Sequence, residues 1–250
     1  MRKLLFLLIL SLTLLPILQV NAQGNSTKSD EVVVFSKQPI EDTEELFERA
    51  KNGITDYSND KKMLNFEITK TSGNTDLDFK VKEKYVTTQK IKQVNKGELT
   101  ITSYATTGIA EVQSYSKSSD KTDSSLSVKY YNTMYWDSYT KSGTTQYFLK
   151  ITKVYGKWEI LDNKVQISNK DILAVQEGLG YTSGKYVYYN QIIANDVSSS
   201  YTTAYTPSSW EAVARTGSVG QISSRVSSDI KRGTETWSGY CSLTETPGYQ

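Results

Sequence analysis

Histidine is absent from this 250-residue chain. An imidazole is the general base of the Ser-His-Asp triad, the usual partner of a nucleophilic cysteine and a common zinc ligand, so none of these arrangements can form. The sequence also contains no Gly-rich phosphate-binding loop and no calcium-loop spacing. We therefore predict no metal site, no cofactor, no catalytic residue and no enzyme activity.

Cysteine is nearly absent, because Cys241 is the only one in the chain. No intramolecular disulfide can form, whereas many small secreted eukaryotic domains depend on disulfides. This scarcity favours a bacterial exported protein. With no histidine to activate it, Cys241 is interpreted as a buried or exposed spectator thiol, and an intermolecular disulfide is the alternative.

An excess of charge of either sign is also missing, since 29 basic residues stand against 27 acidic ones. The small surplus of basic residues is accounted for by Arg2 and Lys3. These two residues precede the apolar run 4–20 and a small-residue cleavage site that ends at Ala22. This layout is typical of a signal peptide cleaved after Ala22, and its removal leaves a formally neutral chain. We predict a secreted, extracellular protein with no nucleic-acid partner and no transmembrane segment in the mature chain.

Residues 23–60 are predicted to form an N-terminal linker followed by a helix. Acidic residues crowd the start of 41–51, basic residues lie near its end, and Gly53 follows where a helix commonly terminates. An antiparallel β domain is expected over 61–168. Residues 169–250 are expected to be a β-rich C-terminal region, which could be a second small domain.

Alternating apolar and polar residues predict most of the strands. Residues 64–68 and 77–81 alternate on either side of a turn at 72–74 and are expected to pair as a hairpin. Residues 126–167 are expected to form a three-stranded meander, with turns near Gly143 and Gly156. The predicted fold class is mainly β, as an antiparallel meander, curled sheet or sandwich, with α+β as the alternative.

One or two short helices are expected in addition to the N-terminal one. Residues 168–180 look like a short capped helix, and Ser208-Ser209-Trp210-Glu211 contains a capping-box pattern. The spacing of apolar residues over 219–230 fits a helix, while the many serines and the turn signal at Gly233 fit two strands equally well.

The segment Lys153–Ile160 resembles the closing hairpin of small secreted NTF2-like or cystatin-like modules. The resemblance covers less than a tenth of the chain, and the strands before and after it do not fit one such module. It implies a curled antiparallel sheet with a helix in its concavity, and no family is assigned from it.

The predicted meander is unusually aromatic. Tyr131 and Tyr135 have the opposite parity to Tyr130 and Trp136, so they are left outside if the latter pair packs in the core. Exposed rings on a rigid sheet can stack on sugars or anchor a protein partner. The candidate binding residues are Tyr131, Tyr135, Tyr139 and Trp158.

These patterns favour a secreted bacterial, non-catalytic binding or adhesion-type protein that recognises a surface, a glycan or a protein, with a cell-envelope glycan or protein as its partner. The first alternative is a secreted pore-forming or toxin-like protein, because residues 97–135 could form an amphipathic hairpin. The second is a carboxylate-dependent hydrolase, for which Asp137, Glu159 and Asp162 are the available acids.

Overall fold

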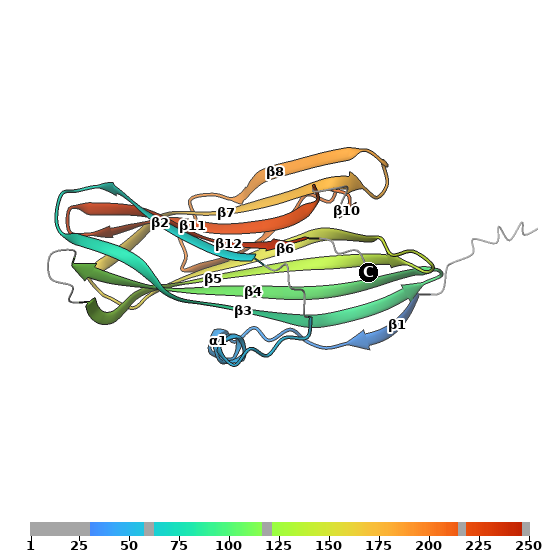
Figure 1. The fold of residues 1–250 in the computed structure, drawn as a ribbon, viewed down its shortest axis with the longest axis horizontal. Coiled ribbons are helices and arrows are strands. Elements are labelled where there is room, and N and C mark those ends of the chain that lie inside the picture. The colour runs from blue at the N-terminus through green and yellow to red at the C-terminus, as the bar shows by residue number, and fades with distance from the viewer. Residues whose placement is uncertain (1–30, 58–62, 117–121, 215–218, 247–250) are drawn as a thin grey trace, which may run out of the picture.

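Long antiparallel strands make up most of the molecule (Figure 1). The structure is a computed structural model that describes residues 31–57, 63–116, 122–214 and 219–246. The predicted signal peptide and its cleavage site lie outside these residues. Within them, the elements are β1 Glu31–Ser36, α1 Thr43–Lys51, β2 Met63–Ser72, β3 Leu77–Lys96, β4 Leu99–Ser116, β5 Thr122–Lys141, β6 Tyr147–Ile160, β7 Val165–Gly180, β8 Tyr186–Ala194, β9 Tyr201–Tyr205, β10 Val213–Ala214, β11 Gln221–Arg232 and β12 Glu235–Glu245.

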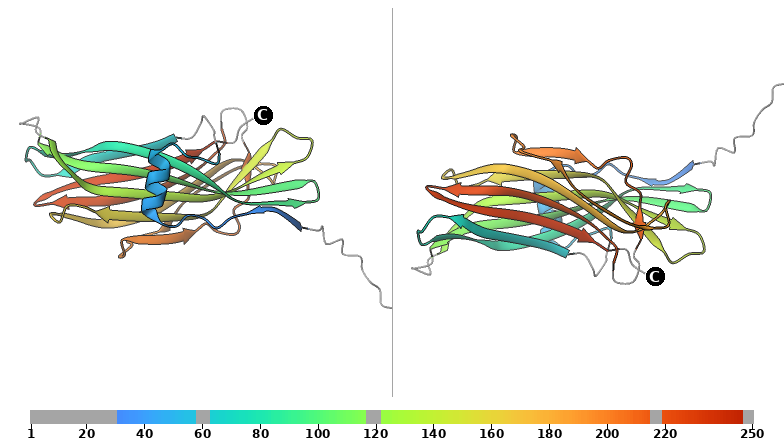
Figure 2. Two further views of the ribbon diagram at one scale, coloured as in Figure 1. Left: turned by 90° about the horizontal axis from the view of Figure 1, so that it is seen from below. Right: turned by 90° about the horizontal axis from the view of Figure 1, so that it is seen from above.

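The strands form one open antiparallel sheet, which confirms the predicted mainly β class. Its hydrogen-bonded order is β1-β3-β4-β5-β6-β10-β7-β11-β12-β2, with β8 added beside β7 and β9 beside β6. The sheet folds over so that β7, β11, β12 and β2 lie across β3 to β6 (Figure 2). Because β7 runs through residue 168, the predicted division at that residue does not coincide with a division of the sheet.

The core lies between these two layers and is rich in large aromatic side chains. Trp136 and Trp158 come from one layer and Trp237 from the other, and all three are almost completely buried. Tyr130 spans the same space, where its hydroxyl lies 2.6 Å from Ser228 Oγ. The alternation seen in the sequence of β5 therefore marks the core face, as predicted.

Helix α1 lies across the outer face of the β3–β5 layer (Figure 2). The Asp42 carboxylate caps it by accepting hydrogen bonds from the backbone N–H groups of Glu44 and Glu45, both at 2.9 Å. Gly53 follows the helix with a φ of +66°, a conformation that glycine adopts without strain. The buried face of the helix is the predicted one, with Leu46, Phe47 and Ala50 against the sheet.

Several sequence-based expectations are wrong. Residues 168–180 form strand β7 instead of a helix, and the capping-box pattern at 208–211 precedes the two-residue strand β10. In the described residues, α1 is the single helix. None of these residues forms a helix long and apolar enough to cross a membrane. The ambiguous segment 219–237 forms two strands, β11 and β12, that turn at Gly233.

Two predicted strand pairings also differ from the structure. Strand β2 pairs with β12 instead of β3, and Gly156 lies within β6 instead of at a turn. A Cβ at Gly156 would lie 3.1 Å from Ile172 Cδ1 and 3.2 Å from Val226 Cγ2, so the glycine permits close approach of the two layers. The segment that resembled an NTF2-like closing hairpin is therefore one continuous strand, and the helix lies outside the layers.

Candidate functional site

The predicted binding residues do not share one environment. Tyr131 is 1% exposed because α1 covers it, and its hydroxyl donates a 3.1 Å hydrogen bond to Glu159 Oε2. Trp158 is 2% exposed and belongs to the core. The expectation that these two rings are available at the surface is therefore wrong. Tyr135 and Tyr139 are partly exposed, and each lines a hollow in the surface.

Tyr139 lies at the far end of β5 from α1, beside the loop that carries Trp210. Its ring stacks on Tyr181 at a centroid distance of 6.1 Å, and the two rings line a hollow of about 280 Å³ with Lys150 and Glu211. Burial, reinforced by the neighbouring Asp137 carboxylate, raises the pKa of Tyr139 to about 12. Glu211 Oε2 accepts hydrogen bonds from the backbone N–H groups of Thr182 and Ser183, so this oxygen stabilises the loop at 181–183.

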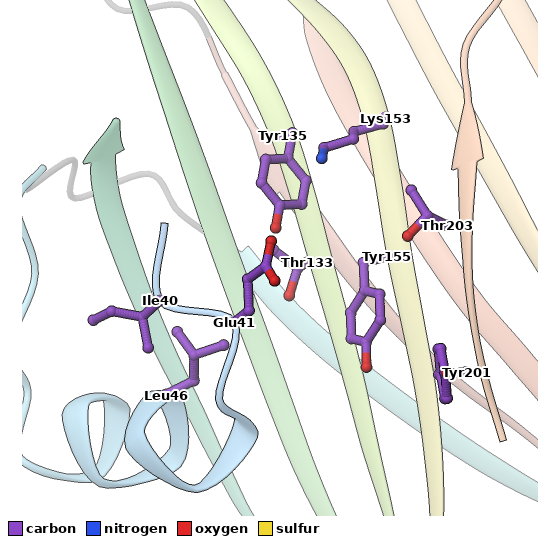
Figure 3. Close-up of a pocket in the computed structure, with 9 residues that line it drawn as sticks. All are labelled: Ile40, Glu41, Leu46, Thr133, Tyr135, Lys153, Tyr155, Tyr201 and Thr203. Carbon is purple, nitrogen blue, oxygen red and sulfur yellow. The ribbon is translucent and has the colours of Figure 1, made fainter. Parts of the chain in front are cut away.

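Tyr135 lies in a second hollow, here called the tyrosine groove, which has a volume of about 260 Å³ (Figure 3). Three segments far apart in sequence meet there. They are the start of α1 with the residues before it, the paired strands β5 and β6, and strand β9. The lining residues are Ile40, Glu41, Leu46, Thr133, Tyr135, Lys153, Tyr155, Tyr201 and Thr203.

Strand register explains the order of side chains along the groove. Thr133 lies opposite Tyr155 in the β5–β6 ladder, and Tyr135 lies opposite Lys153. Tyr155 in turn lies opposite Thr203 of β9. Because side chains opposite one another in antiparallel strands project to the same face, these residues line one surface. Tyr201 extends this row, with its ring centroid 6.3 Å from that of Tyr155.

The position of α1 closes the other side of the groove. Lys157 Nζ donates a 2.8 Å hydrogen bond to Thr43 Oγ1, which joins β6 to the first residue of the helix. Phe47 anchors the same helix through an edge-on contact with Tyr85, at a centroid distance of 5.3 Å. The helix is thus fixed at two places; Leu46 of the helix and Glu41, just before it, line the groove.

Burial and neighbouring groups raise the pKa of two phenols in the groove, those of Tyr135 and Tyr155. Burial, and then the Glu41 carboxylate, raise the pKa of Tyr135, whose hydroxyl points toward that carboxylate (Figure 3). Burial, then Tyr201 and Glu41, raise the pKa of Tyr155. The Lys153 ammonium lies 4.2 Å from the centre of the Tyr135 ring, a cation–π distance. The groove therefore offers hydroxyl groups that can donate or accept hydrogen bonds, and one ion of each sign.

The carboxylates that the sequence offered for hydrolysis are engaged elsewhere. Asp137 accepts a 2.6 Å hydrogen bond from Ser103, and Asp162 forms an ion pair with Arg232 at 3.2 Å. Glu159 lies opposite Lys129, which is about 26 Å along β5 from Asp137 at the usual rise per residue. A glycosidase needs two carboxyl groups about 5 to 9 Å apart. Glu41 is the one carboxylate that lines the tyrosine groove.

Sequence reasoning missed most of this site. Sequence patterns place Tyr155 in a turn and Glu41 only at the start of a helix. Tyr201 and Thr203 belong to a segment that fits either a strand or a loop, although their alternation with buried Ala204 is a strand signal. A comparison with known proteins gives no further guide, since no protein-family model, no curated protein and no solved structure matches the chain.

Proposed function

We propose that this chain is a secreted bacterial, non-catalytic binding protein that recognises a cell-envelope glycan in the tyrosine groove. The observation that carries the proposal is the row of partly exposed rings formed by Tyr135, Tyr155 and Tyr201 on a rigid sheet. Tyr201 is 59% exposed. Such exposure leaves the ring face available to a ligand.

Sugars suit this surface because they present apolar C–H faces and many hydroxyl groups. The tyrosine rings offer flat apolar faces, while Thr203 and the phenols offer hydrogen-bonding groups at the edges. The volume of about 260 Å³ is close to the lower end of small-molecule sites, which start near about 300 Å³. The groove would therefore hold a short stretch or an end of a longer glycan.

Co-sedimentation of the purified chain with bacterial cell-wall sacculi, and with liposomes in parallel, tests this proposal. We expect sedimentation with sacculi and not with liposomes. Tyr155→Ala and Tyr201→Ala should each weaken binding by about 1 kcal/mol or more, which is about fivefold in affinity. Tyr155→Phe keeps the ring and should retain most of the binding if stacking dominates.

Tyr188→Ala is the matched control, because Tyr188 is similarly exposed, at 56%, but lies on β8 away from the groove. It should bind sacculi as the unchanged chain does. Equal binding by all the variants would reject the groove as the site. Sedimentation with liposomes alone would instead favour membrane attack over glycan recognition.

A further inference from the structure

Strand β1 is the first strand of the hydrogen-bonded path, and its only ladder in the described part of the chain is the one to β3. A strand at the end of a sheet has backbone N–H and C=O groups on its far side that no neighbouring strand satisfies. Such an edge is a template for pairing with a strand from another molecule. Proteins usually protect these edges with charged residues, proline or β-bulges.

Strand β1 carries a charge only at its first residue, Glu31, and one bulge, so this protection is limited. Val32, Val33 and Val34 are 56%, 53% and 54% exposed, and no charged residue or proline interrupts residues 32–36. Its ladder with β3 has a bulge between Val33 and Phe35, so Val34 has no opposite residue in β3. At the other end of the path, β2 carries the charged residues Glu67 and Lys70.

The charges that flank β1 make it complementary to itself. Glu31 is the first residue of the strand, and Lys37 directly follows its last residue. The backbone N–H of Lys37 donates a 2.8 Å hydrogen bond to the Ile91 carbonyl, so the pairing with β3 extends to Lys37. We propose that β1 pairs antiparallel with β1 of a second copy of this chain, in a register centred on Val34. Glu31 then faces the partner's Lys37 at both ends of the pairing.

The existing contacts of these two charges permit this pairing. Glu31 lies 3.8 Å from Lys92, and Lys37 lies 3.5 Å from Asp56, and all four side chains are partly exposed to solvent. Ion pairs at the surface contribute little stability and can be rearranged or shared. In the proposed register the apolar residues also face one another, since Val33 lies opposite the partner's Phe35.

The geometry of the pairing sets how two copies are arranged. Identical antiparallel strands in one sheet are related by a twofold axis perpendicular to that sheet, so the same face of each copy points the same way. Helix α1 lies on the outer face of the layer that contains β1 (Figure 2), and the tyrosine groove is lined in part by Ile40, Glu41 and Leu46, at and just before the start of this helix. The dimer would thus present two grooves on one side. This bivalent display rests on the proposed function, whereas the dimer itself does not.

Sedimentation velocity of the purified chain, without ligand, tests the pairing. A strand of six residues buries less than a standard interface, so the measurement should extend to about 200 µM protein. We expect a dimer whose fraction rises with concentration. Val34→Lys and Val34→Glu each place like charges opposite one another across the axis, so each variant alone should remain monomeric.

Mixing the two variants is the decisive step, because a lysine of one copy and a glutamate of the other then meet at the axis. The mixture should restore the dimer, whereas Ile160→Lys, at an exposed apolar position on β6, should dimerise as the unchanged chain does. A monomer at all concentrations would overturn the proposal, as would a dimer that survives either Val34 variant. A mixture that stays monomeric would overturn the register.

Discussion

Replacing Asn132 with alanine should destabilise the protein more than most single substitutions. Asn132 is fully buried on β5, where its side chain reaches the opposite layer. Its Nδ2 donates hydrogen bonds to the Ser224 carbonyl at 3.0 Å and to the Cys241 carbonyl at 2.9 Å. Its Oδ1 accepts a 2.8 Å hydrogen bond from Ser224 Oγ. One amide therefore joins β5 to both β11 and β12.

The magnitude follows from these three bonds. Each contributes about 1 kcal/mol net, and the groups left without a partner in the core add a desolvation cost, together with a small cavity. We expect Asn132→Ala to lower the free energy of unfolding by about 3 to 5 kcal/mol. That is a large part of the roughly 5 to 15 kcal/mol typical of a folded domain.

Equilibrium unfolding in urea, followed by tryptophan fluorescence, measures this loss, because Trp136, Trp158 and Trp237 are buried in the same core. The matched control is Asn190→Ala, which removes an exposed amide that donates to Tyr188 and should change stability by less than about 0.5 kcal/mol. A loss below about 1 kcal/mol for Asn132→Ala would refute the reasoning, because buried unsatisfied groups cost more than that.

Two further predictions concern packing and pH. Gly108→Ala would place a Cβ 2.8 Å from Leu243 Cδ2, so it should lower the free energy of unfolding by about 1 to 3 kcal/mol. Urea unfolding measures this loss, and an unchanged urea midpoint would contradict the close approach. Hydrogen bonds from Thr75, aided by Lys70, lower the pKa of Glu235 in the folded protein. The ionised Glu235 carboxylate therefore stabilises the fold at pH values above the ordinary pKa of a glutamate. This stabilisation is lost as the pH falls through the lowered pKa of the folded state. Glu235→Gln should therefore flatten the pH dependence of stability in that acidic range, measured by urea midpoints from about pH 7 to about pH 3, and an unaltered profile would contradict it.

The sequence predicts much of the fold where one strand face is apolar and the other polar. It fails at β7, whose buried positions from residue 172 onward carry Ile172, Ala174, Gln176, Gly178 and Gly180. This inward row has no continuous apolar alternation, so nothing marks it as a strand. Gln176 is tolerated there because its Oε1 accepts a 2.9 Å hydrogen bond from the Ile151 N–H, and only the folded layers reveal that partner.

The candidate site was less accessible to sequence reasoning than the fold. Parity separates the two faces of β5 correctly, but it cannot show that α1 covers Tyr131 and leaves Tyr135 open. Likewise, Tyr155 and Tyr201 meet only because β9 joins the edge of β6. Alternation reports which face a residue occupies, whereas a binding groove depends on which distant segment lies over that face.

The pairing of β2 with β12 has a consequence for how the molecule is assembled. This pairing joins residues that are far apart in the sequence, since Leu64 lies opposite Leu243 and Phe66 lies opposite Cys241. Contacts between such remote positions close slowly, because a long loop must be ordered first. During synthesis, β2 can form its ladder only after β12, the last strand, has been synthesised. A chain truncated before Glu235 lacks β12, so β2 loses the strand with which it pairs and the core side chains that β12 covers are exposed.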